Sequence, residues 1–446
     1  MQPILATQIN TVSPPRQRKI GFLELAKSYA GIIDSRESTY RTALDITGFC
    51  LPIMGAAAFR NTWSFLEATF ESVIDCLMVY IAPQTTTFVG KILSKKILPE
   101  EEQKDYFHYL GFLRSDLENL DALKQGVKRI EQEEIKDKER IAELYKKTGN
   151  EKKANHFLNR AKETQDFCKR FTISEDKRQN IQKLKKSVIL GESLLESIIW
   201  GFKGLFIRLF RKHILRQDRF TGTLGYLSDS ESATLGEGSE ISLIQKIGIG
   251  VATVISPIIN AFFLKKIEKP DNVKNSKFYT IVNDQIDMTH SVYPKLGLLF
   301  TYLQVPELLG MISTSQGKYE ILERILRYCA GIPSWWCGHR VTNGLMAKIA
   351  DERLQKEFNK TGILVEPQKR DKNSLWDRLC DYFPEPARIQ HVLDRTEGNK
   401  DLQEKAVDLH AKTLYGGFAL HSFLIWVLMM GVNALTKLRV MRTLKN

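Results

Sequence analysis

The chain has 446 residues, of which 43% are apolar and 26% are charged, and its formal net charge is +13. These values exclude a wholly disordered chain, and the positive charge favours an acidic partner, either an anionic lipid surface or nucleic acid. Six cysteines are too few for a disulfide-rich scaffold. We expect an all-α fold, because the period-two apolar runs that mark β-strands are essentially missing.

The N-terminal part divides into an arm and an apolar region. Residues 1–20 should form a flexible arm, since Pro14 and Pro15 disfavour a helix and no long apolar segment marks a cleaved secretory signal. Residues 21–98 should form an apolar, amphipathic helical region. Its uncharged segments 46–59 and 76–90 are shorter than the roughly 18–20 residues that a spanning helix requires. We therefore expect buried helices here, with contact to lipid as the alternative.

Residues 99–186 have the pattern of a charged hairpin of long helices. Apolar residues recur at steps of three and four from Leu113 to Ile130, which predicts a coiled-coil-like seam. A turn at Gly149 should separate the two helices. We expect the hairpin surface of residues 113–171 to bind an unidentified protein partner or a second copy of the chain.

Residues 187–219 should form a basic amphipathic helix. A helix that divides rings from cations in this way suits a lipid interface, with the cations toward an anionic leaflet. A core helix with a basic outer face is the alternative, and nucleic acid is disfavoured because it would leave the apolar side without a role. The residues expected at the membrane surface are Trp200, Lys203, Phe206, Arg208, Phe210, Arg211 and Lys212.

The segment 220–240, rich in Gly, Ser and acids, should be a flexible linker, and residues 241–265 after it form a candidate transmembrane helix. Ile247 to Leu264 carry no charge, and Pro257 is better tolerated among packed membrane helices than in a soluble helix. A buried soluble helix is the alternative.

The stronger candidate is the segment 413–436, which is 24 residues long and uncharged. As a helix it reaches about 36 Å, enough to cross a bilayer with some tilt. Apolar bulk covers every face, with Phe418, Trp426 and Gly431 among its residues. His421 should lie near a helix end or bond a neighbouring helix rather than relay protons.

These two segments predict a multi-pass membrane protein with two spans. The basic tail, residues 437–446, favours a cytoplasmic C-terminus, and two spans then place the N-terminus on the same side. A tail-anchored chain with only the last span is the alternative. Residues 266–412 should form a mixed helical region, in which a crossing by 293–312 stays open.

Short chemical signatures give no reaction. Cys329, Cys337 and His339 lie close in sequence, but their spacing matches no standard zinc site, and a disulfide would require an oxidising compartment. No nucleotide-binding, hydrolase or metalloprotease motif is present, so we expect no cofactor and disfavour an enzyme. The expected role is a membrane-anchored structural or adaptor protein. A component of a membrane transport or pore assembly is the first alternative, and a membrane enzyme without a recognisable motif the second.

Overall fold

The computed structural model describes residues 22–33, 39–217, 219–224, 241–289, 293–334, 338–366 and 383–445. The expected arm of residues 1–20, most of the expected linker 220–240, and Cys337 lie outside these ranges. The all-α prediction is confirmed. Within the described ranges the strands are β1 (Met288–Thr289), which pairs with β2 (Tyr293–Pro294), and Val365 and Pro386 form an isolated bridge.

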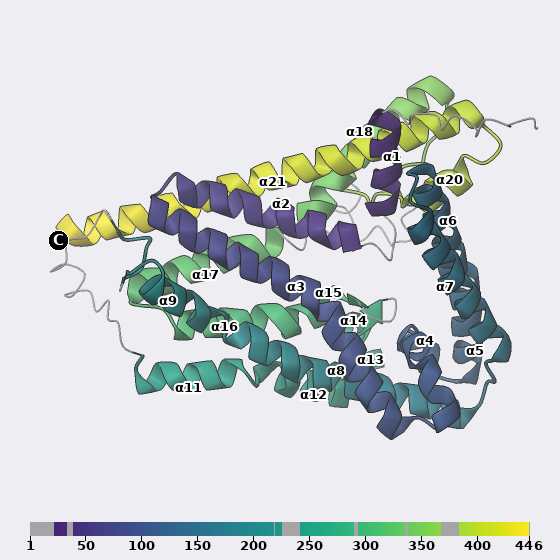
Figure 1. The fold of residues 1–446 in the computed structure, drawn as a ribbon, viewed down its shortest axis with the longest axis horizontal. Helices are drawn as coiled ribbons and strands as arrows, with labels where there is room; N and C mark the ends of the chain where they lie inside the picture. Colours follow the sequence, from purple (N-terminus) through teal and green to yellow (C-terminus); the bar gives the residue numbers. More distant parts are fainter. Residues whose placement is uncertain are drawn as a thin grey trace, which may run out of the picture.

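About half of the described helices form one elongated bundle, and a smaller lobe lies at one of its ends (Figure 1). The bundle consists of α2 (Thr39–Ala58), α3 (Thr62–Ile97), α8 (Glu175–Gly201), α9 (Lys203–His213), α11 (Leu243–Ala252), α12 (Ile255–Ile267), α15 (Leu296–Leu299), the π-helical segment η4 (Phe300–Gln304), α16 (Val305–Ser313), α17 (Lys318–Pro333) and α21 (Lys400–Lys445). The lobe consists of η1 (Glu100–Asp105), α4 (Tyr106–Leu110), η2 (Ser115–Leu117), α5 (Leu120–Arg129), η3 (Ile130–Glu134), α6 (Ile135–Lys147) and α7 (Glu151–Arg170). The remaining helices are α1 (Phe22–Ile33), α13 (Pro270–Asn275), α14 (Lys277–Gln285), α18 (His339–Phe358) and α20 (Ile389–Arg395).

The helix starts follow from short polar signals in the sequence. Asn61 caps α3 by accepting a hydrogen bond from the Ser64 backbone N–H at 2.7 Å. Ser174 caps α8, and the acids of its first turn favour the positive end of the helix dipole. The expected turn at Gly149 is present, and the φ of +75° there suits glycine.

The lobe contains the expected helical hairpin, but a continuous coiled coil is not shown. α6 and α7 pack against each other across the Gly149 turn. Before them the helical path is broken by the 3-10 segment η2 and by the π-helical segment η3. The apolar seam is nevertheless buried, since Leu123, Ile130 and Ile141 all lie in the interior.

The basic segment 187–219 is two helices rather than one. α8 ends at Gly201, and α9 begins at Lys203. A side chain at Gly201 would collide with the backbone of Ala252 on α11, and one at Gly310 on α16 would collide with the Gly201 carbonyl. The junction of α8 and α9 is therefore a point where three helices meet at close range.

The two candidate spans differ in their continuity. α21 is the one described helix that is long and apolar enough to cross a membrane by itself. Only 22% of its apolar stretch is buried inside the protein. α11 and α12 are long and apolar enough for one span only when taken together, and their axes are bent by 44° at the break between them. Pro257 explains the break, since it has no N–H to donate to the Thr253 carbonyl one turn before it.

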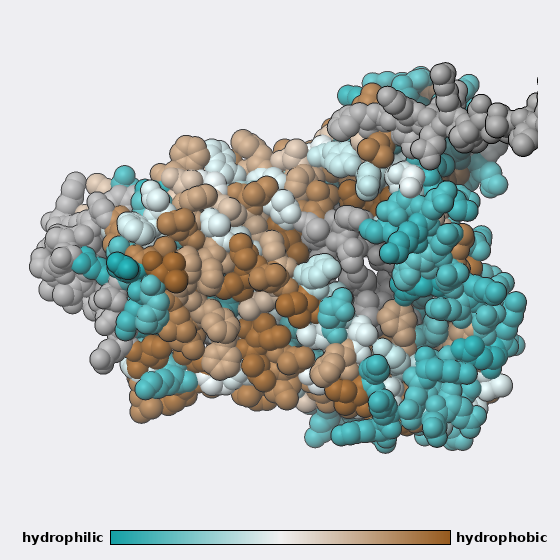
Figure 2. All heavy atoms as spheres, viewed as in Figure 1, coloured by the Kyte–Doolittle hydropathy of each residue, from teal (hydrophilic) through white to brown (hydrophobic). Residues whose placement is uncertain are grey.

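The surface of the molecule is divided along its length. Apolar residues cover the bundle where α2, α3, α9 and α11 lie, and hydrophilic residues cover the lobe (Figure 2). A packed core of apolar residues, among them Phe112, Phe167, Val188 and Tyr302, joins the lobe to the bundle.

Candidate functional site

The site begins with an acidic face on α3. Glu67, Glu71 and Asp75 are spaced by four residues, so they lie on one face of the helix. This face points into the bundle, and Leu66, Val73 and Leu77 of the same helix are exposed. The acids of α3 are therefore interior groups, and its apolar residues form part of the outer surface.

The cations of α9 are turned toward these acids. The side chains of Lys203 and Arg211 are 1% exposed, and Arg208 is also buried. Phe206 and Leu209 on the other face of α9 are 45% and 43% exposed. The sequence predicts these cations at the lipid surface, toward anionic headgroups, whereas Lys203, Arg208 and Arg211 are buried in the bundle. The physical reason is that carboxylates of neighbouring helices pair with the cations inside the bundle.

The other residues expected at the membrane surface are divided between interior and exterior. Trp200 is buried, and Phe210 stacks on Phe70 with ring centroids 4.0 Å apart. Lys212 is exposed, as expected.

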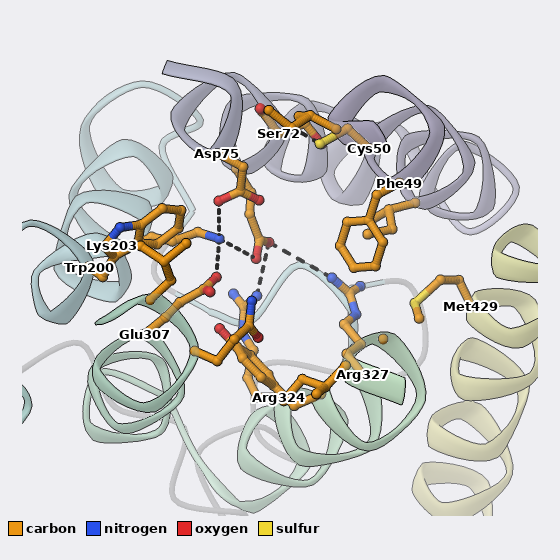
Figure 3. A pocket seen from close by; sticks show the side chains of 18 residues that line it. Phe49, Cys50, Ser72, Asp75, Trp200, Lys203, Glu307, Arg324, Arg327 and Met429 are labelled. Atoms are coloured by element: carbon orange, nitrogen blue, oxygen red, sulfur yellow. Dashed lines mark hydrogen bonds and ion pairs between the residues drawn. The ribbon is translucent and has the colours of Figure 1, made fainter. Parts of the chain in front are cut away.

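Lys203 lies at the centre of three carboxylates (Figure 3). Its Nζ is 2.5 Å from Asp75 and 3.5 Å from Glu71, and it also donates to Glu307 of α16. Among the described residues, no other cation pairs with Asp75 or Glu307. Lys203 thus holds together α3, α9 and α16.

Arginines extend this network toward one end of the bundle. Arg211 pairs with Glu67 at 2.7 Å and with Glu320 of α17 at 2.8 Å. Arg324 of α17 lies 3.0 Å from Glu71. Further along, Glu323 pairs with Arg327 at 2.7 Å and with Arg60 at 2.8 Å. Each of these charges therefore has an opposite charge within reach, as a low-dielectric interior requires.

A cavity of about 100 Å³ adjoins this network. Its wall carries both charged side chains and apolar or aromatic ones (Figure 3). The charged part consists of Glu71, Asp75, Lys203, Glu307, Arg324 and Arg327, and the apolar part includes Ile46, Phe49, Ile53, Trp200, Ile332 and Met429. A concave apolar site with a few convergent polar groups is the usual form of a small-molecule site.

Buried polar groups continue from the cavity along α8. Lys203 lies over the Trp200 ring, 5.7 Å from its centroid, and the Trp200 indole N–H donates to Glu196 at 3.0 Å. Glu196 accepts a second hydrogen bond from Thr85 at 2.7 Å, and Glu192 one turn away accepts from Thr86. The interior polar groups thus form a path along the bundle axis.

Oxygen atoms of Glu71, Asp75 and Glu307 lie within 4.8 Å of one another, a separation that a metal ion could bridge. Carboxylate oxygens are ligands for hard cations. The Lys203 ammonium already lies among these oxygens and supplies a positive charge there.

The residues singled out in the two candidate spans lie outside this network. Ile247 is exposed, Pro257 is half-buried and Leu264 is buried. On α21, Phe418 lies against Gly48, and Trp426 lies near Gly55. The structure does not bring these residues together as a site.

His421 is buried beside Gly338, at the N-terminus of α18. Gly431 is exposed, and a methyl group added to its Cα would meet no described atom within 4 Å.

The acids of α3 and α17 were not predicted as site residues. Their spacing does carry a signal: acids recur every four residues on α3, cations occur eight residues apart on α9, and α17 carries both signs at helical spacing. Such complementary faces on separate helices indicate helices that pack charge against charge.

Comparisons of the chain with protein families, with curated proteins and with solved structures found no match.

Proposed function

We propose that the chain is a membrane-embedded helical protein that binds a small solute inside its bundle, as a component of a transport assembly. The observation that supports this proposal is the polarity of the bundle, which is apolar outside and charged inside. A helix in a soluble protein turns its charged face to water. In a bilayer, ionisable side chains face the interior and mark the paths of ions or substrates.

The exposed apolar residues are numerous and come from several helices of the bundle. They include Leu51 of α2, Leu77 and Phe88 of α3, Ile198 of α8, Phe206 of α9, Ile247 of α11, Phe262 of α12, and Phe423 and Leu428 of α21. A surface of this extent exceeds the isolated apolar residues that soluble proteins expose. Lipid is the partner that suits it.

The proposed topology differs from the two-span arrangement expected from the sequence. The C-terminal end of α21 lies at the end of the bundle away from the lobe (Figure 1). Insertion of the bundle therefore puts the lobe and the basic tail on opposite sides of the membrane. Arg439 and Arg442 are exposed at the tail end and favour anionic headgroups there.

Reconstitution tests this function. Liposomes containing the full chain are placed in hyperosmotic solutions of small cationic, anionic and zwitterionic solutes, and re-swelling is followed by light scattering. We expect faster re-swelling than in empty liposomes for at least one solute class. Lys203→Met should alter that rate, and Lys212→Met, at an exposed position, should not. Rates equal to those of empty liposomes for every class would contradict the proposal.

Partner binding through the hairpin is a second proposal. α6 packs on α1, and Arg140 of α6 pairs with Asp394 of α20, so part of the hairpin surface contacts its own chain. The outward face of α7, with Lys152, Glu163 and Lys169 exposed, is left for a partner or a second copy. Light scattering of the purified protein in detergent tests self-association, and a mass of one chain per particle would exclude it.

A further inference from the structure

We infer that the cavity binds a small zwitterion with an apolar body, that is, a molecule with one ammonium group, one anionic group and a short hydrocarbon part. This inference deepens the proposed function and rests on it. Three features of the cavity carry it: the balance of charges in its wall, the accessibility of both signs, and the apolar part of the wall.

The charged wall is balanced. Three carboxylates, those of Glu71, Asp75 and Glu307, face three cations, those of Lys203, Arg324 and Arg327. A ligand with a single charge of either sign would add an uncompensated charge to a buried site, which is costly in a low dielectric. A zwitterion leaves the balance unchanged.

Both signs are accessible at this wall. The side chains of Asp75 and Arg327 are 21% and 19% exposed, whereas that of Lys203 is 1% exposed. Arg327 lies 3.9 Å from Glu71, a loose contact that a ligand anion can replace, and its contact with Glu323 at 2.7 Å keeps it in position. Asp75 can thus accept from a ligand ammonium while Arg327 donates to a ligand anion.

One buried donor at the cavity also lacks an acceptor. The side chain of Arg324 is 4% exposed, and its Nε–H has no hydrogen-bond partner in the described part of the chain. A buried donor without an acceptor is unfavourable, so this group favours an anionic oxygen or a water molecule in the cavity. It lies on the same helix as Arg327, which places both donors in one part of the wall.

The apolar residues of the wall favour a ligand with a hydrocarbon part. Phe49 and Met429 lie on the side of the cavity away from Lys203 (Figure 3), and Ile53 also contributes apolar surface to its wall. A cavity of about 100 Å³ suits a hydrocarbon part of a few carbon atoms. The same chemistry occurs in free apolar amino acids and in the headgroup region of aminophospholipids.

Binding of labelled L-leucine to the purified full chain in detergent tests the inference, with four competitors. Isoamylamine keeps the body and the ammonium, 4-methylpentanoate keeps the body and the carboxylate, glycine keeps both charges without the body, and dioctanoyl phosphatidylethanolamine presents the lipid form. We expect saturable leucine binding, with the first three competing at least tenfold more weakly than unlabelled leucine.

Each outcome supports or overturns the inference. Competition by isoamylamine as strong as by leucine would overturn it in favour of a cation site, and strong competition by 4-methylpentanoate would overturn it in favour of an anion site. If no saturable leucine binding is found and the phospholipid binds saturably instead, the zwitterion chemistry stands with lipid as its source. Saturable binding of neither would overturn it.

Two variants test which residue contacts the ammonium of the ligand and which contacts its anionic group. Asp75→Asn should weaken leucine binding at least tenfold without weakening the binding of 4-methylpentanoate, and Arg327→Gln should weaken leucine binding at least tenfold without weakening the binding of isoamylamine. Asp284→Asn, at an exposed ion pair with Lys295, is the control. Should either cavity variant fail to fold, the competition series on the unaltered chain decides alone. Leucine binding without solute flux would refute transport but not the zwitterion site, and flux without binding of either leucine or the phospholipid would refute the zwitterion site but not transport.

Discussion

The ammonium of Lys203 lies 2.5 Å from the carboxylate of Asp75, on a helix that is distant in sequence, inside a bundle whose outer surface is apolar. Removing one member of a buried ion pair leaves an uncompensated charge, which typically costs about 3–5 kcal/mol. We therefore expect Lys203→Met to lower the free energy of unfolding by about this amount, because Asp75 and Glu307 lose the cation that pairs with both.

Unfolding of the purified protein in mixed micelles measures this loss. Adding Asp75→Asn and Glu307→Gln to Lys203→Met should restore part of the stability, since fewer unpaired charges remain. Lys212→Met, at an exposed position, should stay within about 0.5 kcal/mol of the unaltered chain. Equal effects of Lys203→Met and Lys212→Met would show that the central ion pairs are not formed.

Because the exterior of the bundle is apolar, we expect the effect of an added charge on membrane association to depend on where the charge is placed. Leu428 of α21 and Leu120 of α5 are both 42% exposed, but Leu428 lies on the bundle and Leu120 on the lobe. An arginine near the middle of a spanning helix costs about 2.5–3.5 kcal/mol. Leu428→Arg should therefore reduce the carbonate-resistant membrane fraction, and Leu120→Arg should leave it unchanged. A similar fraction for both variants would place α21 outside the bilayer.

The lobe should lose stability in acid. Burial, helped by the charge of Lys138, lowers the pKa of His108 from its usual 6.5 to about 4. The His108 ring stacks on the Phe167 ring, with ring centroids 4.6 Å apart. The unfolded chain protonates His108 more readily than the folded chain does. The contribution of neutral His108 to the free energy of unfolding is therefore fully present above pH 6.5 and falls by up to about 3 kcal/mol as the pH drops toward 4.

Hydrogen exchange of the α4 and α7 amides between pH 7 and pH 4 measures this effect after correction for the intrinsic exchange rates. In His108→Phe, which keeps a ring against Phe167, the fall in protection should be smaller. An unchanged fall in this variant would assign the acid sensitivity to other groups.

Because α8 and α16 approach closely, we expect Gly310 not to tolerate replacement by a residue with a side chain. A side chain at Gly310 would collide with the Gly201 carbonyl, whereas one at Gly250 would meet no described atom within 4 Å. Gly310→Leu should destabilise the bundle by about 1–3 kcal/mol or more, as overpacking does. Gly250→Ala should be neutral or stabilising by up to about 1 kcal/mol, because alanine favours the helix. Thermal unfolding of both variants in the same detergent makes the comparison, and equal tolerance would contradict the close contact.

Local patterns predicted the helices well, and the site poorly. The Gly149 turn and the apolar length of α21 are properties of short segments, so they were visible in the sequence. The direction in which the α9 cations point depends on the acids of α3, α16 and α17, which lie more than 90 residues away in the chain. A single amphipathic helix has the same pattern whether its cations face lipid headgroups or pair with acids of neighbouring helices, so the sequence did not indicate that Lys203 and Arg211 are buried.

Thiol accessibility at four positions tests the central claim, the insertion of the whole bundle, most directly. Single cysteines at positions 150, 212, 360 and 442, in a chain otherwise free of cysteine, are labelled in sealed proteoliposomes of one orientation with an impermeant reagent. The bundle topology predicts that 150 and 360 share one side and that 212 and 442 share the other. Finding 442 alone opposite the other three would reduce the protein to a tail anchor, and labelling of all four from one side would contradict a membrane-spanning bundle.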